Sequence, residues 1–472
     1  MKSICSFLGA LLLLLTANAQ KSPSQPLFDM NKILDESTLG VEVIQDWHLV
    51  PGKIPTRQKY MTINVGEFWP GQNYRVPVRL IVPAKSKAKG FHLTGGHQLQ
   101  RIQKDYKLRG IDEELIKGNV GLVHTIVQTL NSWGQKELWD ALHKRFYKSL
   151  NPHDSIQYWG WPGSLMRAVT AAYAEKDYFE PGKIVASGGS KNGASPSVSL
   201  IHDKRITGLV ASVSPISESP LRLCDEEAWK KLKEYESTKG SKRKHPFLGG
   251  TFGPIYNQHA LDQGHTWEDL KKLAKRVEDY VFVSKNLEQF KARGVQMLFH
   301  PGTHDFVCFD MHHVGKNYPQ IPIYLGVNTG HGKKGSKSFR ERQENLPAFL
   351  MQHFFDGVGE FLNPPKVSSK KVGNKLQVTV KFDSKSKAES GQIFWVYDRA
   401  PDGSLDYINQ MFPEDQHKKM KYHEKTNSWS VEIDLKSGAK QIDFFSNHKK
   451  TLKHNSRPYS TIISSPYTRV KL

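Results

Sequence analysis

A serine flanked by glycines stands where a predicted strand passes into a predicted helix. The segment is Gly188-Gly189-Ser190-Lys191-Asn192-Gly193, and the apolar run 184–186 precedes it. A nucleophilic serine in such a strained strand-to-helix turn requires small neighbours. Gly188 and Gly193 satisfy that requirement, although the strict G-x-S-x-G pattern would have glycine at position 192. The segment predicts a nucleophilic Ser190; the alternative is a glycine turn with an incidental serine.

A serine hydroxyl is a weak nucleophile, so it needs a histidine to accept its proton and a carboxylate to orient that histidine. Candidates follow two later predicted strands, in the chain order serine, acid, histidine that accompanies this kind of turn. Asp305 comes after strand 294–300, and His331 comes after strand 321–327. We therefore expect Asp305 to orient His331. Two other acids are alternatives: Asp310 and Glu218.

An acyl-transfer site also needs backbone N–H groups that point at the developing oxyanion. The residue after the nucleophile, Lys191, supplies one such group. The second is expected from the glycine-rich loop Thr94-Gly95-Gly96-His97-Gln98, which follows the third predicted strand of the core. Gly96 and His97 are the two candidates for that donor.

The elements that must position these residues alternate between short apolar strands and helices. Six strands are predicted after a hairpin at 60–69 and 74–83: 90–96, 119–127, 183–187, 208–214, 294–300 and 321–327. Such alternation is typical of a doubly wound, mostly parallel α/β sheet that is covered on both faces. We expect a catalytic domain over 20–363, with an N-terminal arm over 20–55 and a lid insertion at about 217–280.

A second module is predicted after the proline pair at 364–365, where the helical pattern ends. Alternating apolar residues there predict five strands: 375–382, 391–397, 428–435, 439–446 and 459–463. Residues 366–472 are thus expected to form an all-β sandwich. No serine, histidine or acid in that module stands in a catalytic context, so we expect it to contribute no catalytic residue.

The composition is that of a folded protein, with 38% hydrophobic and 24% charged residues. Residues 1–19 have the basic, apolar and small-residue pattern of a cleaved secretory signal peptide, so a secreted or periplasmic protein without a membrane span is expected. The formal net charge is +21, and +20 without Lys2. This excess favours an anionic partner, for which an acidic polysaccharide is a better candidate than nucleic acid because no nucleic-acid-binding motif accompanies the charge. The alternative is a lysine-rich surface that aids solubility and has no specific partner.

Cysteine and histidine patterns do not indicate a metal or a cofactor. Only Cys224 and Cys308 follow the signal segment, and a disulfide between them is allowed but is not required by so large a core. The 20 histidines include no His-Glu-x-x-His or comparable short-range pair. We expect neither a metal nor a cofactor.

The same segments carry a family resemblance. Ser190 in its glycine turn, the segment 301–305, the late Thr329-Gly330-His331 and a β-rich tail with Trp395 and Trp429 together resemble the PhoPQ-activated pathogenicity-related proteins, which are similar to α/β-hydrolases. The turn is also similar to that of acetylxylan esterases and to the Gly-Cys-Ser-Arg-x-Gly turn of glucuronoyl esterases. Gly189 and Lys191 replace the Cys and Arg of the latter, so a glucuronoyl substrate does not follow from the motif.

Together these features predict an exported serine hydrolase, most plausibly a carboxylic ester hydrolase of the carbohydrate-esterase kind that works through an acyl-enzyme. A serine peptidase on the same fold and a catalytically inactive glycan-binding protein are the alternatives. Trp159 and Trp161 precede the helix that leads to the nucleophile strand and could stack on a sugar ring. The alternative is that both aromatics pack that helix start against the sheet.

Overall fold

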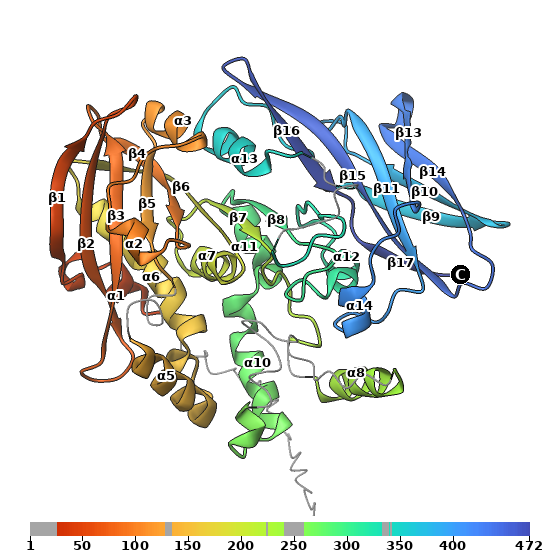
Figure 1. Cartoon of the computed structure of the whole chain (residues 1–472), viewed down its shortest axis with the longest axis horizontal. Coiled ribbons are helices and arrows are strands. Elements are labelled where there is room, and N and C mark those ends of the chain that lie inside the picture. The colour runs from red at the N-terminus through yellow and green to blue at the C-terminus, as the bar shows by residue number, and fades with distance from the viewer. Residues whose placement is uncertain (1–25, 128–134, 223–224, 240–258, 333–338, 340–341) are drawn as a thin grey trace, which may run out of the picture.

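The computed structural model describes residues 26–127, 135–222, 225–239, 259–332, 339 and 342–472. Its main sheet has the strand order β1-β2-β3-β5-β4-β6-β7-β8 (Figure 1). The first strands form an antiparallel edge, and β5, β4, β6, β7 and β8 run parallel. The bounds are Glu42–Val50 (β1), Thr56–Glu67 (β2), Asn73–Pro83 (β3), Ala88–Thr94 (β4), Gly121–Thr125 (β5), Phe179–Gly189 (β6), Gly208–Ser212 (β7) and Gln296–His300 (β8).

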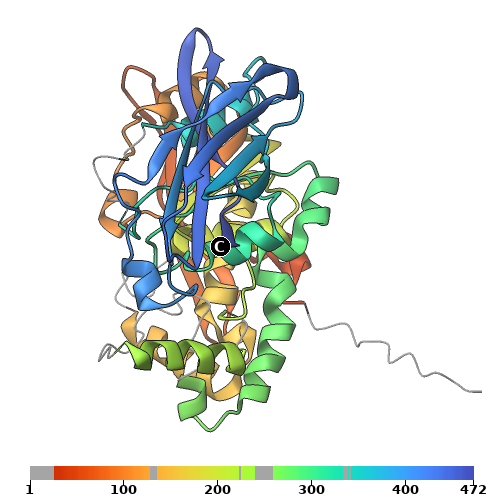
Figure 2. The same ribbon diagram turned by 90° about the vertical axis from the view of Figure 1, so that its right-hand side faces the viewer.

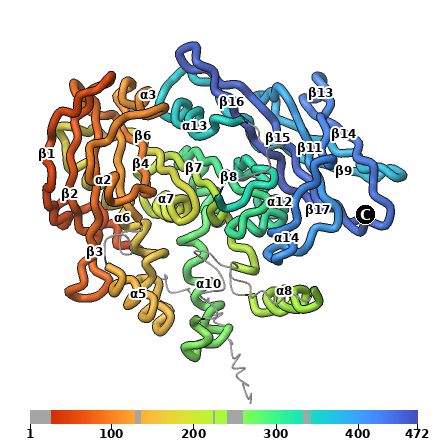
Figure 3. Tube along the Cα trace, viewed as in Figure 1, coloured from red at the N-terminus to blue at the C-terminus, as the bar shows by residue number. Residues whose placement is uncertain are grey.

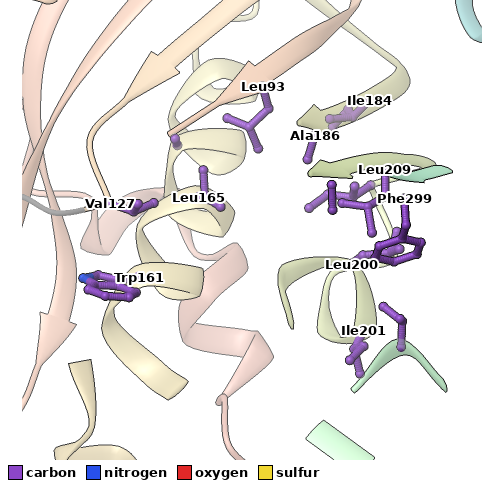
Figure 4. Packing of buried hydrophobic residues seen from close by; sticks show 14 of the residues in the cluster. Leu93, Val127, Trp161, Leu165, Ile184, Ala186, Leu200, Ile201, Leu209 and Phe299 are labelled. Atoms are coloured by element: carbon purple, nitrogen blue, oxygen red, sulfur yellow. The ribbon is translucent and has the colours of Figure 1, made fainter. Parts of the chain in front are cut away.

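Side chains alternate between two buried faces along the central strands, which is why these strands are apolar at nearly every position. Ile184 and Ala186 of β6 belong to the hydrophobic cluster on one face, whereas Val185 belongs to the cluster on the other. Figure 4 shows Ile184 and Ala186 together with Leu209 and Phe299 of the neighbouring strands. The predicted α/β-hydrolase core, a mostly parallel sheet covered on both faces, is confirmed.

Helices cover each face of this sheet. On one face lie α6 (Trp161–Ala174) and α7 (Lys191–His202), and on the other lie α3 (Ile111–Lys117) and α13 (Asn345–Phe354). The other described α-helices are α1 (Met30–Leu34), α2 (Leu99–Ile102), α5 (Lys136–Ser149), α8 (Glu226–Thr238), α10 (Trp267–Val281), α11 (Leu287–Ala292), α12 (Met311–Asn317) and α14 (Leu405–Asn409). Within the described ranges, no helix is long and apolar enough to cross a membrane.

Two elements of the core differ from the prediction. The arm expected over 20–55 contains α1 but also strand β1, which pairs with β2 at the edge of the sheet. The prediction of a regular strand over 321–327 was wrong. In the described structure this segment is joined to β8 and to the loop after it only by the isolated bridges Phe299–Ile323 and Gly302–Gly326. Pro322 cannot donate a ladder hydrogen bond. On the side of this segment that faces away from β8, the N–H of Ser464 from the C-terminal part donates to the Ile323 carbonyl at 2.7 Å.

The insertion between β7 and β8 contains α8 and α10, which extend away from the main sheet (Figure 1). Helix α10 packs its apolar side on α7: Leu270, Leu273 and Val277 share a hydrophobic cluster with Ala194 and Val198. A capping box at Thr266 and Asp269 fixes the start of α10. The insertion therefore supports the helix that follows Ser190.

Residues 366–472 form two antiparallel sheets, as the alternation predicted. One has the order β13-β14-β10-β9, and the other has the order β12-β11-β15-β16 with β17 paired to β15. The bounds are Lys366–Val372 (β9), Lys375–Lys381 (β10), Ser390–Tyr397 (β11), His417–Lys419 (β12), Lys421–His423 (β13), Ser428–Asp434 (β14), Gln441–His454 (β15), Arg457–Ser464 (β16) and Thr468–Lys471 (β17).

These sheets lie beside the main sheet and face the viewer in Figure 2; Figure 3 follows the chain between the two parts. Val378 of β10 and Ile393 of β11 belong to the same hydrophobic cluster as Leu350 of α13 and Val210 of β7. Asn345 at the start of α13 bonds both backbone groups of Ile462, each at 2.9 Å. The C-terminal sheets are thus joined to the core by buried apolar and polar contacts.

Candidate active site

The turn between β6 and α7 holds Ser190 in a backbone conformation that serine rarely adopts. Its φ is 58° and its ψ is −129°. The Ser190 N–H donates to the Ser212 carbonyl at 2.8 Å, and the Ser190 carbonyl accepts from Gly193 and Ala194, also at 2.8 Å. Strain of this kind persists only where the surroundings hold it, and it is typical of active sites. The expected strand-to-helix turn is present at Ser190, and its role as nucleophile stays a prediction.

The glycines around Ser190 are required by close backbone approaches. A Cβ at Gly188 would lie 2.0 Å from the Asn192 carbonyl oxygen, and a Cβ at Gly193 would lie 2.9 Å from the Gly188 oxygen. Asn192, which stands where the strict motif has glycine, places its amide 3.3 Å from the Cβ position of Gly96. The turn can therefore hold asparagine at position 192, with its glycine at 193, because the Asn192 side chain points toward the Gly96 loop.

That loop contains Gly96 and His97, the two candidates for the second oxyanion donor. The Gly95 carbonyl accepts from Val127 N–H at 3.0 Å, and a bridge joins Gly96 to Ile126. These bonds hold Gly96 beside Asn192, two residues after Ser190. Lys191 is the first residue of α7, where a backbone N–H has no acceptor within the helix. Burial lowers the pKa of the Lys191 side chain.

His97 of the same loop is half-buried and packed against a second histidine. Its Nε2 lies 2.6 Å from Thr94 Oγ1, and its ring stacks on His124 with the centroids 4.0 Å apart. Burial, reinforced by the charges of Arg101 and Arg109, lowers the pKa of His97 to about 4. His97 is therefore neutral at pH 7 and can serve as a hydrogen-bonding group but not as a cation.

The structure joins Asp305 and His331. Nδ1 of His331 lies 3.0 Å from Oδ1 of Asp305, which also accepts from the Val307 N–H at 2.9 Å. Asp305 is 1% exposed, whereas His331 is half-buried and packs against Phe306 with ring centroids 4.4 Å apart. A carboxylate that is fixed by a backbone N–H and bonded to Nδ1 leaves Nε2 of the imidazole as the other ring nitrogen for proton transfer.

Ser190 and this pair lie at the same end of the sheet. Ser190 follows β6 and Asp305 follows β8, and both strands run parallel to β7 between them. His331 follows segment 321–327, which is bridged in parallel to β8 and its loop. Within the described part of the chain, Ser190 Oγ has no hydrogen bond to His331, so their direct contact stays a prediction. Such contacts are often loose without substrate.

The alternative acids have other partners. Asp310 forms a buried ion pair with Arg222, whose Nε is 3.0 Å from Oδ2. Glu218 accepts hydrogen bonds from Ser284 and Tyr318 and lies 3.4 Å from the Lys285 ammonium. Neither carboxylate has a recorded bond to His331, which favours Asp305 as the orienting acid.

The two tryptophans occupy packing positions. Trp161, labelled in Figure 4, is 3% exposed at the start of α6. Its ring stacks with that of Trp139, with the centroids 6.0 Å apart. Trp159 is half-buried and meets Phe68 edge-on at 5.0 Å. Both contacts agree with the alternative that the two tryptophans pack the start of the helix. Trp161 is too deeply buried to offer a ring face to a sugar. Stacking of a sugar on Trp159 stays a prediction.

Two other expectations fall partly outside the described residues. The signal segment 1–19 and Cys224 are among the residues that the structure does not describe, so neither expectation is tested. Cys308 is buried, and burial together with the Asp305 carboxylate raises its pKa well above the usual value. In the described ranges, no group of three or more His, Cys, Asp or Glu side chains could hold a metal ion.

Sequence reasoning missed the residues that hold the loops of Asp305 and His331. From the C-terminal part, Arg399 donates to the Thr303 carbonyl in the loop after β8, and Phe412 exchanges two hydrogen bonds with Asn328 in the loop after segment 321–327. One signal was present, since Asn readily adopts the positive φ that Asn328 has, 52°. The contact made by Arg399 has no signature in the sequence, because its partner is 96 positions away.

Comparisons with known proteins give structural likeness only. No family model matches the chain, and no curated protein matches it. Among solved structures, acetyl xylan esterase 1 from Thermoanaerobacterium sp. JW/SL YS485 is 14% identical, with a TM-score of 0.40 and coverage of 69% of this chain and 90% of that one. A glucuronoyl esterase from Teredinibacter turnerae T7901 is 13% identical, with a TM-score of 0.34 and coverage of 60% and 67%.

A glucuronoyl esterase from Solibacter usitatus is 15% identical, with a TM-score of 0.31 and coverage of 60% and 70%. All three scores are below 0.5, so we base the fold on the strand order and the serine turn, and we take no substrate from these proteins. Because no family model matches, the resemblance to the PhoPQ-activated proteins stays a prediction.

Proposed function

We propose that this protein is a serine hydrolase of the carboxylic ester hydrolase class, in which Ser190 is the nucleophile, His331 the base and Asp305 the residue that orients His331. One observation carries the proposal: the strained Ser190 stands at the same end of the sheet as a buried Asp305 bonded to His331 Nδ1. If Ser190 were an incidental serine in a glycine turn, there would be no reason to expect the Asp305–His331 bond at the same end of the sheet.

In the proposed reaction, Ser190 Oγ attacks the ester carbonyl carbon while His331 Nε2 takes the hydroxyl proton. The carbonyl oxygen becomes the oxyanion, which the backbone N–H groups of Lys191 and of Gly96 or His97 stabilise. Collapse of the intermediate expels the alcohol, which receives the proton from His331. Water, activated by His331 in the same way, then releases the acid and restores Ser190.

Reaction with a fluorophosphonate probe tests this assignment. Wild-type protein should be labelled, and Ser190→Ala should abolish the labelling. Ser195→Ala is the matched control because its hydroxyl lies within the same helix and donates to the Lys191 carbonyl at 2.7 Å. Unreduced labelling of Ser190→Ala would refute the nucleophile assignment. Hydrolysis of acylated sugars but not of peptides would distinguish an esterase from a peptidase, and a glycan-binding protein would show neither activity nor labelling.

An anionic substrate, such as an ester on an acidic polysaccharide, is the proposed substrate class. A cavity of about 990 Å³ adjoins the Gly96 loop. Five cationic side chains line it: Arg79, Arg101, Lys104, Lys107 and Arg109. One of them, Arg79, is already paired with Asp105 at 3.4 Å, so the other four supply the attraction for an anion. The proposed export of the protein would bring it into contact with such polymers.

Paired substrates test the substrate class. Arg101→Gln combined with Lys104→Gln should raise KM several-fold for an ester on an acidic polymer and leave a small neutral ester unchanged. Lys370→Gln with Lys371→Gln removes the same charge from β9, which Figure 1 shows far from α2. Added salt should weaken only the reaction of the polymer, since screening acts beyond about 10 Å at ~0.1 M salt. Equal effects of the two double variants would refute an anionic substrate at this cavity.

A further inference from the structure

Two residues of the C-terminal part reach the loops that carry Asp305 and His331. Arg399 follows β11, and Phe412 follows α14. The first contacts the loop after β8, and the second contacts the loop after segment 321–327. Neither loop belongs to the C-terminal sheets, so these contacts connect separate parts of the fold.

Arg399 holds the acid loop through its backbone. Arg399 is 1% exposed, and its guanidinium donates to the Thr303 carbonyl, two residues before Asp305. The same Nη2 donates to the Tyr407 carbonyl at 3.0 Å, and Nη1 lies 2.8 Å from the Tyr467 hydroxyl. The Tyr407 ring lies 3.7 Å from the guanidinium carbon, measured to the ring centroid. A planar group with these partners has one orientation available, so the Thr303 carbonyl is fixed as well.

Asn328 holds the histidine loop in a matching way. Its amide Nδ2 donates to the Phe412 carbonyl at 2.9 Å, and its Oδ1 accepts from the Phe412 N–H at 2.8 Å. The side chain is 3% exposed and its backbone has a φ of 52°. Two bonds in a buried place prevent rotation of the amide, and His331 is three residues further along the chain.

The two loops are also bonded to each other. Thr303 Oγ1 accepts from the Asn328 N–H at 2.8 Å, and the His304 N–H donates to the Thr329 carbonyl at 3.1 Å. A Cβ at Gly302 would lie 2.0 Å from that carbonyl, so the approach is close along the whole contact. A shift of either loop is therefore transmitted to the other.

We propose that segment 398–412 positions the acid and histidine loops, with Arg399 and the Asn328–Phe412 pair as positioning residues for the Asp305–His331 bond. This inference rests on the proposed function. The C-terminal part supplies none of the three proposed catalytic residues, yet Arg399 and Phe412 add buried bonds to those that the core itself makes to the two loops. Removing one anchor should lower kcat and leave KM nearly unchanged, because the substrate-binding surface is elsewhere.

Asn328→Gly is the decisive variant, since glycine retains the positive φ and loses both bonds to Phe412. Asn345→Ala is its matched control. Asn345 makes the same two-bond contact from the core to the C-terminal part, with Ile462. Its amide also lies 3.3 Å from Nε2 of His300, the last residue of β8, and in the described part of the chain Asn345 makes no bond to the His331 loop. Both variants should lower Tm by a few degrees. Only Asn328→Gly should lower kcat and the rate of fluorophosphonate labelling, by about 10- to 100-fold, as expected for a displacement near 1 Å.

The inference would be overturned if the two variants had the same kcat, whether both kept the wild-type value or both lost it to the same extent. Arg399→Lys provides a second variant should Asn328→Gly not fold, because lysine retains the charge and loses the planar fork. It should again lower kcat at constant KM, and unchanged kcat would contradict the role of Arg399. Labelling of Ser190 in the wild type separates this result from the proposed function, since failure there would refute the hydrolase itself.

Discussion

Replacing Asp305 by Asn is the sharpest test of the proposed site, because it changes charge and hardly changes shape. The carboxylate oxygen Oδ1 faces His331 Nδ1 at 3.0 Å and is also held by the Val307 N–H. An amide oxygen in the same place can accept both contacts, but it carries no charge to stabilise the imidazolium that forms as Ser190 loses its proton. The amide can also present its NH₂ group to Nδ1, which favours the wrong tautomer of His331.

The size of the effect follows from that geometry. With the charge centres about 4 Å apart, the attraction between carboxylate and imidazolium is about 4 kcal/mol at an effective dielectric constant of about 20. That energy corresponds to about 10³-fold in rate, and the loss of the correct tautomer increases the effect toward about 10⁴-fold. We therefore expect Asp305→Asn to lower kcat by about 10³- to 10⁴-fold. Stability should change little, since the variant no longer buries this charge.

Initial rates with a chromogenic ester, together with thermal unfolding, measure both quantities. Asp310→Asn is the control that should give the opposite pattern. It leaves buried Arg222 without its carboxylate, which costs about 3–5 kcal/mol in stability, while kcat per folded molecule remains within a few-fold of the wild type. If Asp305→Asn kept more than a tenth of wild-type kcat, or if Asp310→Asn lost activity while folded, Asp305 would not be the orienting acid.

Three further outcomes are expected. Gly96→Ala places a Cβ 3.3 Å from the Asn192 amide and should lower kcat about 10-fold by displacing the oxyanion loop; an unchanged kcat would move the second donor to another residue. Gly302→Ala places a Cβ 2.0 Å from the Thr329 carbonyl and should lower the free energy of unfolding, measured in denaturant titrations, by about 3 kcal/mol. Gly332→Ala is the control and should leave that free energy unchanged, because a Cβ at Gly332 meets no described atom within 4 Å. Burial lowers the pKa of His92 from 6.5 to about 4, so between these pH values the imidazole is protonated in the unfolded chain and neutral in the folded one. The free energy of unfolding should therefore fall as the pH decreases from 6.5 to 4. His92→Gln should make the free energy of unfolding from urea titrations depend less on pH, and an unchanged pH dependence would contradict this reasoning.

The core sheet and the chain order of the candidate site residues could be predicted from the sequence, because both depend on local pattern. Apolar runs that alternate with helices require a sheet with two covered faces. The glycines at 188 and 193 indicate a tight turn because only a residue without a side chain fits against the Asn192 and Gly188 carbonyls. The strand pattern of 375–382, 391–397 and 428–435 was equally local, and β10, β11 and β14 match it closely.

Other features depend on partners that are distant in the sequence. Segment 321–327 has the composition of a strand, yet only isolated bridges join it to the sheet, while Ser464, far along the chain, bonds its outer side. Trp161 could have faced solvent or the core, and the neighbouring Trp139 from α5 makes it a core residue.

The sequence by itself determined the types and the order of the site residues: a serine in a glycine turn, then an acid, then a histidine, each after an apolar segment. Only the tertiary structure decided which acid bonds His331, because Asp305, Asp310 and Glu218 differ in their neighbours and not in their chemistry. Arg222 holds Asp310, Ser284 and Tyr318 hold Glu218, and Asp305 is left to face His331. The anchoring of both loops by Arg399 and Phe412 was decided in the same way, since a buried donor takes whichever carbonyl the packing brings within reach.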